Sequence, residues 1–399
     1  MSRLAELIEE LCPDGVEYRR LDELFATRNG YTPSRSDMSA WDSLDVPWFR
    51  MEDIRENGGI LDRALTYVSS SAVKNGVLFP ENSLLVATSA TIGAHALITV
   101  PHLSNQRFTS LQLKDQYREY FDCRFLYYYC FILDAFCLDH VNVSSFPSVD
   151  MKAFRSFKFP FVPLAVQREI VRILDQFTTL EAELEAELEA RRAQYEHYRN
   201  YLLSYESLAS HGPVERVKLG DMLEMRAGNA ISSKYIFEQS NSEHFYPCYG
   251  ANGVRGYVRS ITHEHDASII GRQGALCGNV TYAYGPFFAT EHAVVVSPRV
   301  ELSQRWLYHA LIVANLSQYA TKSAQPGLSV RRVAEVEIPV PEIDEQRRIA
   351  DLLDRFDALV NDISSGLPAE IAARRAQYEH YRDRLLSFPE KRVSDSDAS

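Results

Sequence analysis

The chain has 399 residues, of which 46% are hydrophobic and 24% are charged, a balance that excludes a disordered or collagen-like protein. No apolar run approaches the roughly 20 residues of a membrane span, so we predict a cytoplasmic protein without membrane association. The formal net charge of −12 excludes DNA binding through overall positive charge, which leaves only local basic surface for that purpose.

Strand and turn signals dominate residues 1–162, which we predict to form a first α/β domain, here called the first head. It ends in the proline-bounded strand KFPFVP, and the helical pattern of residues 163–211 follows. Within that pattern Leu180, Leu184 and Leu188 recur every four residues in LEAELEAELEA. Residues four apart share one helix face, and Ala, Leu and Glu favour helix, so the region predicts a long helical rod.

Residues 212–341 return to strand and turn signals and are predicted to form a second head, which ends in the strand VEIPVP. A second helical pattern occupies residues 342–388. Its apolar stripe, again with four-residue spacing, consists of Leu359, Ile363, Leu367 and Ile371. The sequence Gly366-Leu367-Pro368 predicts a kink in this second rod. Residues 389–399 are predicted to form a flexible tail.

The ten residues ARRAQYEHYR at 190–199 recur unchanged at 373–382. Each copy closes a helical region that follows a head, so the chain is predicted to consist of two copies of one unit. We expect an α+β fold in which two α/β heads are joined by two long helices, packed as an antiparallel coiled coil with an internal pseudo-twofold repeat. A generic surface helix is the alternative interpretation of LEAELEAELEA.

The identity of the two decapeptides has two explanations. One is a well-packed helix end at which both copies need the same side chains. The other is a pair of equivalent docking sites for one kind of protein partner, which we favour because cores tolerate volume-conserving substitutions. The candidate partner-binding residues are Arg191, Arg192, Tyr195, Tyr198, Arg374, Arg375, Tyr378 and Tyr381.

The two heads align weakly with each other. Arg28 lies opposite Arg226 and Gly30 opposite Gly228 in this alignment. Further along, both heads contain a strand, a Gly-containing turn, a polar triplet and another strand. The triplets are Asn105-Gln106-Arg107 and Thr290-Glu291-His292. Similar scaffolds with different polar residues at matched positions predict two related recognition surfaces with different targets.

Arg pairs with guanine, and Asn or Gln with adenine, in the major groove of DNA, so the polar residues of these loops are candidate DNA contacts. Each one alone is equally well explained as an ordinary loop or turn residue, and only the set carries the prediction. In the first head the candidates are Arg28, Asn29, Tyr31, Arg35, Ser89, Thr91, Asn105, Gln106 and Arg107. In the second head they are Arg226, Asn229, Asn252, Arg255, Arg272, Gln273, Glu291, His292, Lys322 and Gln325.

No catalytic motif accompanies these residues. The chain lacks G-x-x-x-x-G-K-[ST], which argues against a P-loop ATPase, and it lacks an Asn-Pro-Pro-Tyr-like methyltransferase tetrapeptide. None of its six cysteines forms a C-x-x-C pair, and the adjacent residues His263, Glu264 and His265 are more typical of a solvated loop than of a metal site. We therefore predict no catalytic residue, no metal and no cofactor in this chain.

Two variable heads that alternate with two near-identical helical regions resemble the specificity subunit of a type I restriction–modification system. The tetrads at 180–187 and the following ARRAQYEHYRNYLL are similar to those of the IC subclass of that family. The resemblance covers essentially the whole chain. It implies that each head reads one half of a split double-stranded DNA target, while the paired helices set the spacing and dock two methyltransferase subunits.

The resemblance also implies that S-adenosylmethionine belongs to those methyltransferase partners, and that restriction subunits using ATP and Mg join the complex through them. A competing interpretation is a scaffold without DNA binding, in which the helix pair bridges two identical proteins. A stand-alone enzyme is the third. Strong, salt-dependent binding to one particular duplex would separate the first interpretation from the scaffold.

Overall fold

The computed structural model describes residues 3–142, 146–321, 326–362 and 364–391 of the chain. These residues form two compact units: unit 1 comprises Met1–Ala182 with Ala373–Ser399, and unit 2 comprises Glu183–Ala372. Each unit therefore combines one head with helical segments from both repeats. In the described ranges, no helix combines the length and the apolar character that a membrane crossing requires.

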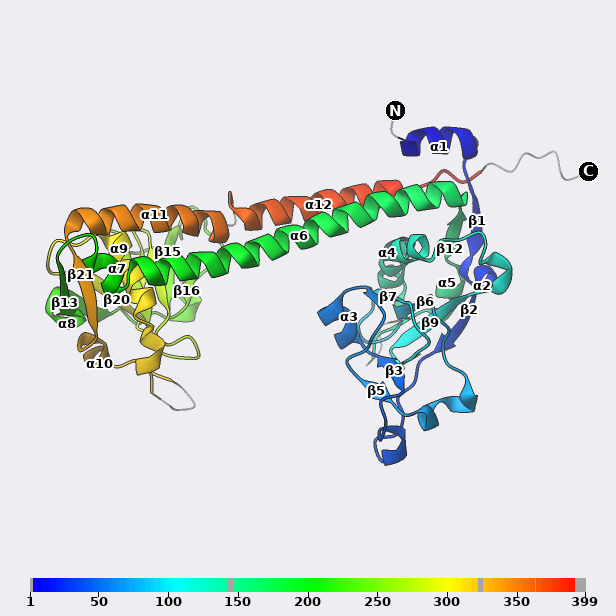
Figure 1. Cartoon of the computed structure of the whole chain (residues 1–399), viewed down its shortest axis with the longest axis horizontal. Coiled ribbons are helices and arrows are strands. Elements are labelled where there is room, and N and C mark those ends of the chain that lie inside the picture. The colour runs from blue at the N-terminus through cyan, green and yellow to red at the C-terminus, as the bar shows by residue number, and fades with distance from the viewer. Residues whose placement is uncertain (1–2, 143–145, 322–325, 363, 392–399) are drawn as a thin grey trace, which may run out of the picture. The chain divides into compact units, whose positions relative to one another are not determined.

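Unit 1 starts with the amphipathic helix α1 (Arg3–Leu11) (Figure 1). Leu4 of this helix is buried in the core of the first head. The other helices of this head are α2 (Leu21–Leu24), α3 (Met51–Asn57), α4 (Cys123–Asp139) and α5 (Met151–Ser156). Its strands are β1 (Glu17–Arg20), β2 (Phe25–Asn29), β3 (Val46–Phe49), β4 (Ile60–Leu61), β5 (Tyr67–Val68), β6 (Ser83–Ala87), β7 (His95–Ile98), β8 (Leu103–Ser104), β9 (Phe108–Leu113), β10 (Val141–Asn142), β11 (Ser148–Val149) and β12 (Lys158–Phe161).

The central strand of the first head, β6, is buried along its whole length because both faces of its sheet are covered. Leu84 and Val86 point to the cluster that includes α4, whereas Leu85 and Ala87 point to a second cluster around Phe49. This alternation is the period of two that a strand imposes. The sheet has the order β2-β9-β6-β7-β4, and β1 pairs separately with β12.

Unit 2 repeats this plan. Its helices besides those of the coiled coil are α7 (Tyr205–Ala209), α8 (Leu219–Met222), α9 (Gln304–Val313) and α10 (Val330–Ala334). Its strands are β13 (Val214–Lys218), β14 (Leu223–Ala227), β15 (Tyr246–Gly250), β16 (Gly253–Val258), β17 (Ala267–Gly271), β18 (Val280–Ala283), β19 (Phe288–Ala289), β20 (Ala293–Pro298) and β21 (Glu337–Pro341).

The strand orders of the two heads match. The sheet β14-β20-β17-β18 has the order of β2-β9-β6-β7, and β13 pairs antiparallel with β21 as β1 does with β12. Strand β15 is parallel to β19 and antiparallel to β16, as β3 is to β8 and β5. The weak sequence alignment of the heads therefore reflects one shared topology.

Three long helices carry the repeated sequence: α6 (Leu164–Leu202), α11 (Ile343–Asn361) and α12 (Leu367–Leu385). Within unit 1, the ring of Phe177 lies 5.8 Å from that of Tyr381, and Glu181 pairs with Arg375. Toward the C-terminus of α6, the residues of α12 that it contacts have lower and lower residue numbers. The two helices are therefore antiparallel. The predicted α+β fold, with two similar heads and antiparallel helices, is confirmed.

The apolar stripe of the rods differs from the simple prediction. Leu188 is buried, but Leu180 is 51% exposed and Leu359 is 43% exposed. A four-residue repeat advances about 40° around a helix with each tetrad, so the stripe drifts out of the interface along its length. Ile363 lies outside the described residues.

The predicted kink of the second rod is a break between two helices. Helix α11 ends at Asn361 and α12 begins at Leu367. Gly366 packs so closely in this break that a Cβ would lie 2.5 Å from the Ala358 carbonyl oxygen. Pro368 follows in the first turn of α12, where the lack of an N–H is tolerated.

The prediction of a flexible tail from residue 389 is wrong for its first residues. The N–H of Val16 donates to the Pro389 carbonyl at 2.9 Å, and the N–H of Lys391 donates to the Val16 carbonyl at 2.9 Å. Leu386 and Phe388, just before them, are buried in the core of the first head. These apolar anchors hold the segment against the head, a contact that no local sequence pattern announces.

Candidate nucleic-acid interface

The polar loops of each head meet at one end of its main sheet. In the first head the N–H of Thr88, directly after β6, donates to the carbonyl of Arg107 at 3.0 Å. In the second head the N–H of Arg272, directly after β17, donates to the carbonyl of His292 at 2.9 Å. The two polar triplets therefore occupy the same place in a shared backbone frame.

Two glycines hold this frame together. The N–H groups of Gly30 and Gly228 donate to the carbonyls of Phe108 and Ala293, each at 2.9 Å. A Cβ at either glycine would lie 2.1 or 2.2 Å from a carbonyl oxygen of the segment that carries the triplet. Only glycine permits this approach, which explains why the aligned positions share it.

In the first head, two predicted residues are engaged by the head itself. The Arg28 guanidinium donates to the Val77 carbonyl at 2.9 Å and lies 4.8 Å from the ring centre of Phe79. The Asn29 side-chain oxygen accepts a hydrogen bond from the buried Thr109 hydroxyl at 3.1 Å. These contacts orient both side chains beside the triplet.

Gln106 and Arg107 are the exposed members of the first triplet. The side-chain oxygen of Asn105 accepts the Arg107 N–H at 3.1 Å and so forms the turn that presents them. Gln106 is hydrogen-bonded to the hydroxyl of Thr32, a residue that the sequence analysis missed. The only signals in the sequence were the hydroxyl group of Thr32 and its position next to Tyr31.

Four other predictions of the first head fall into two groups. Ser89 and Thr91 lie in the turn after β6, next to the triplet, and the Thr91 N–H donates to the Ser89 carbonyl at 2.8 Å. Tyr31 donates its hydroxyl to the Ala72 carbonyl at 2.8 Å and so braces a neighbouring loop. Arg35 is exposed in that loop region.

In the second head, four predicted residues line one cavity of about 530 Å³. Asn252 comes from the turn between β15 and β16, and Arg255 from β16 itself. Gln273 comes from the turn after β17, and His292 from the triplet. The complete lining is Ala251, Asn252, Arg255, Gln273, Gly274, His292, Pro326 and Gly327. The fold thus gathers lining residues from four separate chain segments.

The polar groups of this cavity are linked in pairs. The imidazole Nδ1 of His292 lies 2.9 Å from the side-chain oxygen of Gln273. The side-chain nitrogen of Asn279 donates to the oxygen of Asn252 at 3.3 Å. The sequence analysis missed Asn279. The dipeptide Gly278-Asn279, which lies between two strands, was a turn signal that could have indicated it.

The other described candidates of the second head do not line the cavity. Arg226 is 80% exposed in its side chain and is paired with Glu224 on the edge strand β14. The guanidinium of Arg272 donates to the carbonyl of Glu291 at 3.5 Å. Asn229 forms an isolated bridge with Thr290 of the triplet. Lys322 and Gln325 lie outside the described residues.

The sequence motif considered for a metal has a different environment. The ring of His263 stacks on Phe287 with 5.0 Å between centres, and burial lowers the pKa of its imidazole. Across the described part of the chain, no group of three or more His, Cys, Asp or Glu side chains is arranged to hold a metal ion.

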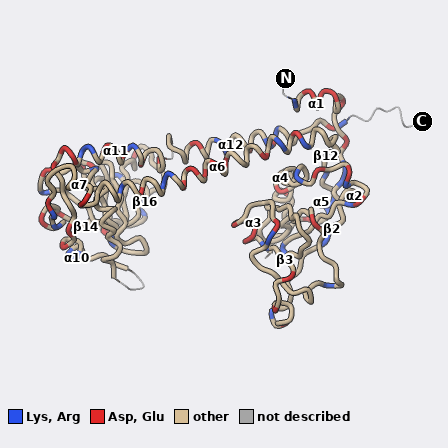
Figure 2. The backbone as a smooth tube through the Cα atoms, viewed as in Figure 1, with Lys and Arg blue, Asp and Glu red and all other residues tan. Residues whose placement is uncertain are grey.

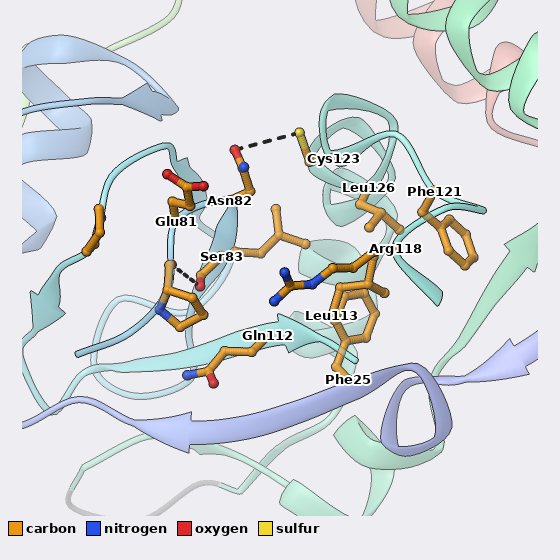
Figure 3. A pocket seen from close by; sticks show the side chains of 13 residues that line it. Phe25, Glu81, Asn82, Ser83, Gln112, Leu113, Arg118, Phe121, Cys123 and Leu126 are labelled. Carbon is orange, nitrogen blue, oxygen red and sulfur yellow. Dashed lines mark hydrogen bonds between the residues drawn. The ribbon is translucent and has the colours of Figure 1, made fainter. Parts of the chain in front are cut away.

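A second cavity, of about 460 Å³, lies in the first head (Figure 3). It is at the opposite end of the sheet from the triplet. It adjoins Ser83 at the start of β6 and Leu113 at the end of β9, whereas the triplet adjoins the other ends of these strands. Arg118 extends into it, and Cys123 lies 3.9 Å from the Asn82 side-chain oxygen. It is therefore separate from the predicted recognition surface.

The two decapeptides pack onto the heads through matching residues. In unit 2 Tyr195 is only 4% exposed, and its hydroxyl lies 3.4 Å from Nδ1 of His309 on α9. In unit 1 its counterpart Tyr378 packs against the core of the first head, and Arg382 lies 4.4 Å from the ring centre of Phe131 on α4. The packing explanation therefore applies to Tyr195 and Tyr378, and their prediction as partner-binding residues is wrong because both side chains pack against a head.

The other tyrosine of each decapeptide remains accessible. Tyr198 is 40% exposed and Tyr381 is 39% exposed. Each rests on a phenylalanine of the antiparallel helix within its unit, with ring centres 6.0 Å apart for Phe356 and 5.8 Å apart for Phe177. The two units therefore present the same side chain in the same way.

The predicted arginines of the decapeptides lie on exposed faces. Arg191 and Arg192 pair with Glu187 and Glu189, each at 3.2 Å. Arg374 and Arg375 are exposed at the matching positions of α12. Acidic and basic residues are interspersed along α6 and α12 (Figure 2). Such exposed ion pairs contribute little to stability and leave the arginines accessible to a partner.

A buried glutamine anchors each head to its rod, and the sequence analysis missed it. The Gln167 oxygen accepts the N–H of Asp122, which caps α4, at 2.9 Å, and its nitrogen donates to the Val162 carbonyl at 2.6 Å. The Gln346 oxygen accepts the N–H of Ser303, which caps α9, at 3.0 Å. The repeated Gln-Arg pair after each proline-bounded strand was the available signal.

An aspartate two helical turns further on makes a second anchor. In unit 2, Asp354 lies 2.6 Å from the Arg305 guanidinium and 2.7 Å from the His309 imidazole. Burial opposes ionisation of Asp354, but the hydrogen bonds from His309 and Arg305 outweigh it and lower its pKa to about 2. In unit 1, Asp175 is placed alike and accepts a hydrogen bond from Tyr128 at 2.5 Å.

With the fold and these surfaces described, the comparisons place the protein in a family. The chain belongs to the type I restriction modification DNA specificity domain family, whose pattern matches residues 13–190 and again residues 212–373. The type I restriction enzyme EcoprrI specificity subunit of Escherichia coli is 51% identical to it over 375 residues, which cover 91% of this chain and 93% of that protein.

Two solved structures share the fold. The S subunit of a type I restriction–modification system from M. genitalium is 17% identical, with a TM-score of 0.53 over 94% of this chain and 97% of that one. A chain from a type I restriction–modification system, solved to explain complex assembly and conformational transition, gives a TM-score of 0.62 at 17% identity, over 94% and 98%. At this identity the likeness concerns the fold alone.

Proposed function

We propose that this chain is the specificity subunit of a type I restriction–modification complex, in which each head recognises one half of a bipartite DNA duplex. The observation that best supports this proposal is the backbone frame that both heads share, with different polar side chains at 105–107 and 290–292. A common frame gives both heads the same way of docking on a duplex, while different side chains at its surface select different base pairs.

Exchange of one head tests this function. Replacing residues 1–162 with the matching segment of a relative of different specificity should replace one half-site and leave the other half-site and the spacer unchanged. The methylated motif, read by sequencing DNA from cells that carry the whole system, measures this. The reciprocal exchange of residues 212–341 is the control. A change of both half-sites from either exchange would show that the heads do not recognise DNA independently.

The decapeptides are proposed to dock two copies of the methyltransferase subunit. Packing accounts for the identity of Tyr195 with Tyr378, which pack against the cores of the heads. It also accounts for the identity of Arg199 with Arg382, which lie over the rings of Tyr195 and Phe131. The other positions of the decapeptide are exposed in both units, where packing does not demand identical side chains. Identity on an exposed face is expected if two copies of one partner bind it.

Tyr198 and Tyr381 are the sharpest test of docking because they are exposed equally. Tyr198→Ala with Tyr381→Ala should abolish co-purification of the methyltransferase subunit, while either substitution alone should leave one copy bound instead of two. Tyr201→Ala is the matched control, because Tyr201 is 58% exposed on the same helix but lies outside the decapeptide. Two bound copies on the double variant, measured by native mass spectrometry, would refute docking at this surface.

Catalysis and cofactors are proposed to belong to the partner subunits. Methyl transfer from S-adenosylmethionine would then require the methyltransferase subunit, and the ATP- and Mg-dependent reactions would require the restriction subunit. The lack of the corresponding sequence motifs supports this division. Methylation of a target duplex by the purified chain alone would contradict it. The scaffold alternative predicts that the chain with its partner retards no particular duplex and shows no salt-dependent DNA binding.

A further inference from the structure

The cavity of the second head presents hydrogen-bond donors toward solvent. Asn252, Arg255 and Gln273 line it and are exposed, so a ligand as large as DNA can reach them. Each of the two amide oxygens is already engaged within the head. For the amide nitrogens of Asn252 and Gln273 and for the Arg255 guanidinium, the described residues supply no hydrogen-bond partner.

The neighbours of these amides decide which way they face. The Gln273 oxygen can only accept, so Nδ1 of His292, 2.9 Å away, must carry the proton of that hydrogen bond. In the same way Asn279 donates to the Asn252 oxygen at 3.3 Å. In both amides the oxygen is therefore held by a neighbour within the head, and the –NH₂ group is left as a donor for a ligand.

The place of Arg255 is set by Gly250 on the neighbouring strand β15. A Cβ at Gly250 would lie 2.5 Å from Cδ of Arg255, so the aliphatic part of the arginine lies directly against the bare glycine backbone. Strands β15 and β16 pair in antiparallel register here. With its aliphatic part fixed in this way, Arg255 lines the cavity together with Asn252 and Gln273.

We propose that this cavity is the subsite with which the second head reads a guanine in the major groove, an inference that rests on the proposed function. Guanine offers two acceptors, O6 and N7, on its major-groove edge. Adenine offers an acceptor beside a donor, and cytosine offers a donor, so both oppose a cluster of donors. Thymine offers one acceptor and a methyl group, which satisfies fewer of the three donors.

His292 is the positioning residue of this subsite. It does not itself need to touch the base, because its contribution is to hold the Gln273 oxygen. Without that imidazole the Gln273 amide is free to rotate, and a rotated amide offers the donor–acceptor pair that matches adenine. The structure therefore links an imidazole in the wall of the cavity to the choice between two purines.

The experiment uses the full chain in complex with its methyltransferase partner and a duplex library randomised over the half-site of the second head. Gln273→Ala and Arg255→Gln should each lower the preference for guanine at one position by about 5- to 150-fold, the range of a good base contact. His292→Ala should instead admit adenine beside guanine at that position. Arg259→Gln is the charge-matched control, because Arg259 follows β16 but does not line the cavity.

Three outcomes would overturn the subsite. The first is that all cavity variants select the same sequence as the wild type. The second is that affinity falls equally for every sequence. A uniform loss, with a salt dependence lower by about one charge, would mark a phosphate contact instead of a base contact. A change at a position that selects a base other than guanine would also refute it. A wild-type complex without any sequence preference would instead contradict the proposed function, so the two failures are distinguishable.

Discussion

The side chains that join heads to rods differ between the repeats but act alike. Asp354 accepts hydrogen bonds from Arg305 and His309, whereas Asp175 pairs with Arg124 at 3.0 Å and with Tyr128. Both repeats therefore contain the aspartate and an arginine partner. The third partner is Tyr128 in unit 1 and His309 in unit 2. A carboxylate held by a charged partner and partly withdrawn from water is a stronger anchor than an exposed ion pair.

Asp354 gives a prediction about pH. Its folded pKa of about 2 lies below the ordinary value near 3.9, so its contribution to stability is present above about pH 4 and is lost as pH falls toward 2. Asp354→Asn should therefore lower the melting temperature at pH 7, and the difference from wild type should shrink by pH 3. Asp351→Asn, at an exposed position of the same helix, is the control. An equal difference at both pH values would contradict this account.

The recognition residues show how far single residues were predictable. Gln106, Arg107, Gln273 and His292 were predicted from polar loops at matched places, and the structure brings them to the same end of each sheet. The hydrogen bond that turns the Gln273 amide was not predictable, because it joins residues nineteen positions apart in sequence through the fold. Which donors are left for a ligand depends on such contacts.

Among the elements, the four-residue repeat was predictable and its packing was not. Tetrads of Leu, Ala and Glu favour helix through propensity alone, and α6 is continuous over 39 residues. The mismatch between a repeat of four and 3.6 residues per turn moves successive leucines around the axis. For this reason Leu188 packs into a core while Leu180 is exposed.

Deleting one tetrad, residues 184–187, tests the proposed spacing role of α6. The deletion shortens the helix by roughly 6 Å and rotates the rest of the helix by about 40°, so the DNA gap between the half-sites should change while both half-sites stay the same. Duplicating the same tetrad should change the gap in the opposite direction. Sequencing of methylated DNA measures both. An unchanged spacer in either variant would refute the spacing role.

For the whole molecule, each head is completed by a rod segment from the other repeat. The first head takes Leu386 and Phe388 into its core, from the far end of the chain. The second head takes Leu203, the residue matched to Leu386, together with Leu208. The duplicated units are therefore interlocked along the chain, and neither head corresponds to one unbroken stretch of sequence.

Because each head takes core residues from a distant rod segment, a substitution in that segment should destabilise the head that it packs against. Leu386→Ala should destabilise the first head by about 2–5 kcal/mol through loss of buried contacts, although the residue lies more than two hundred positions from that head. Leu203→Ala should act on the second head instead. Hydrogen exchange should rise in α4 for the first variant and in α9 for the second. The opposite assignment, or equal effects on both, would contradict the packing of these segments.

Local patterns were enough to predict the duplicated plan: strands, rods, a break at Gly366 and two heads with polar loops at one end. Periodicity, proline placement and an exact repeat act over short distances, so they are legible in the sequence. Tertiary structure alone decided that Tyr195 points inward while Tyr198 stays exposed, and that the –NH₂ groups of Asn252 and Gln273 are left as donors for a ligand. Those outcomes depend on partners from distant segments, whose contacts exist only after the chain has folded.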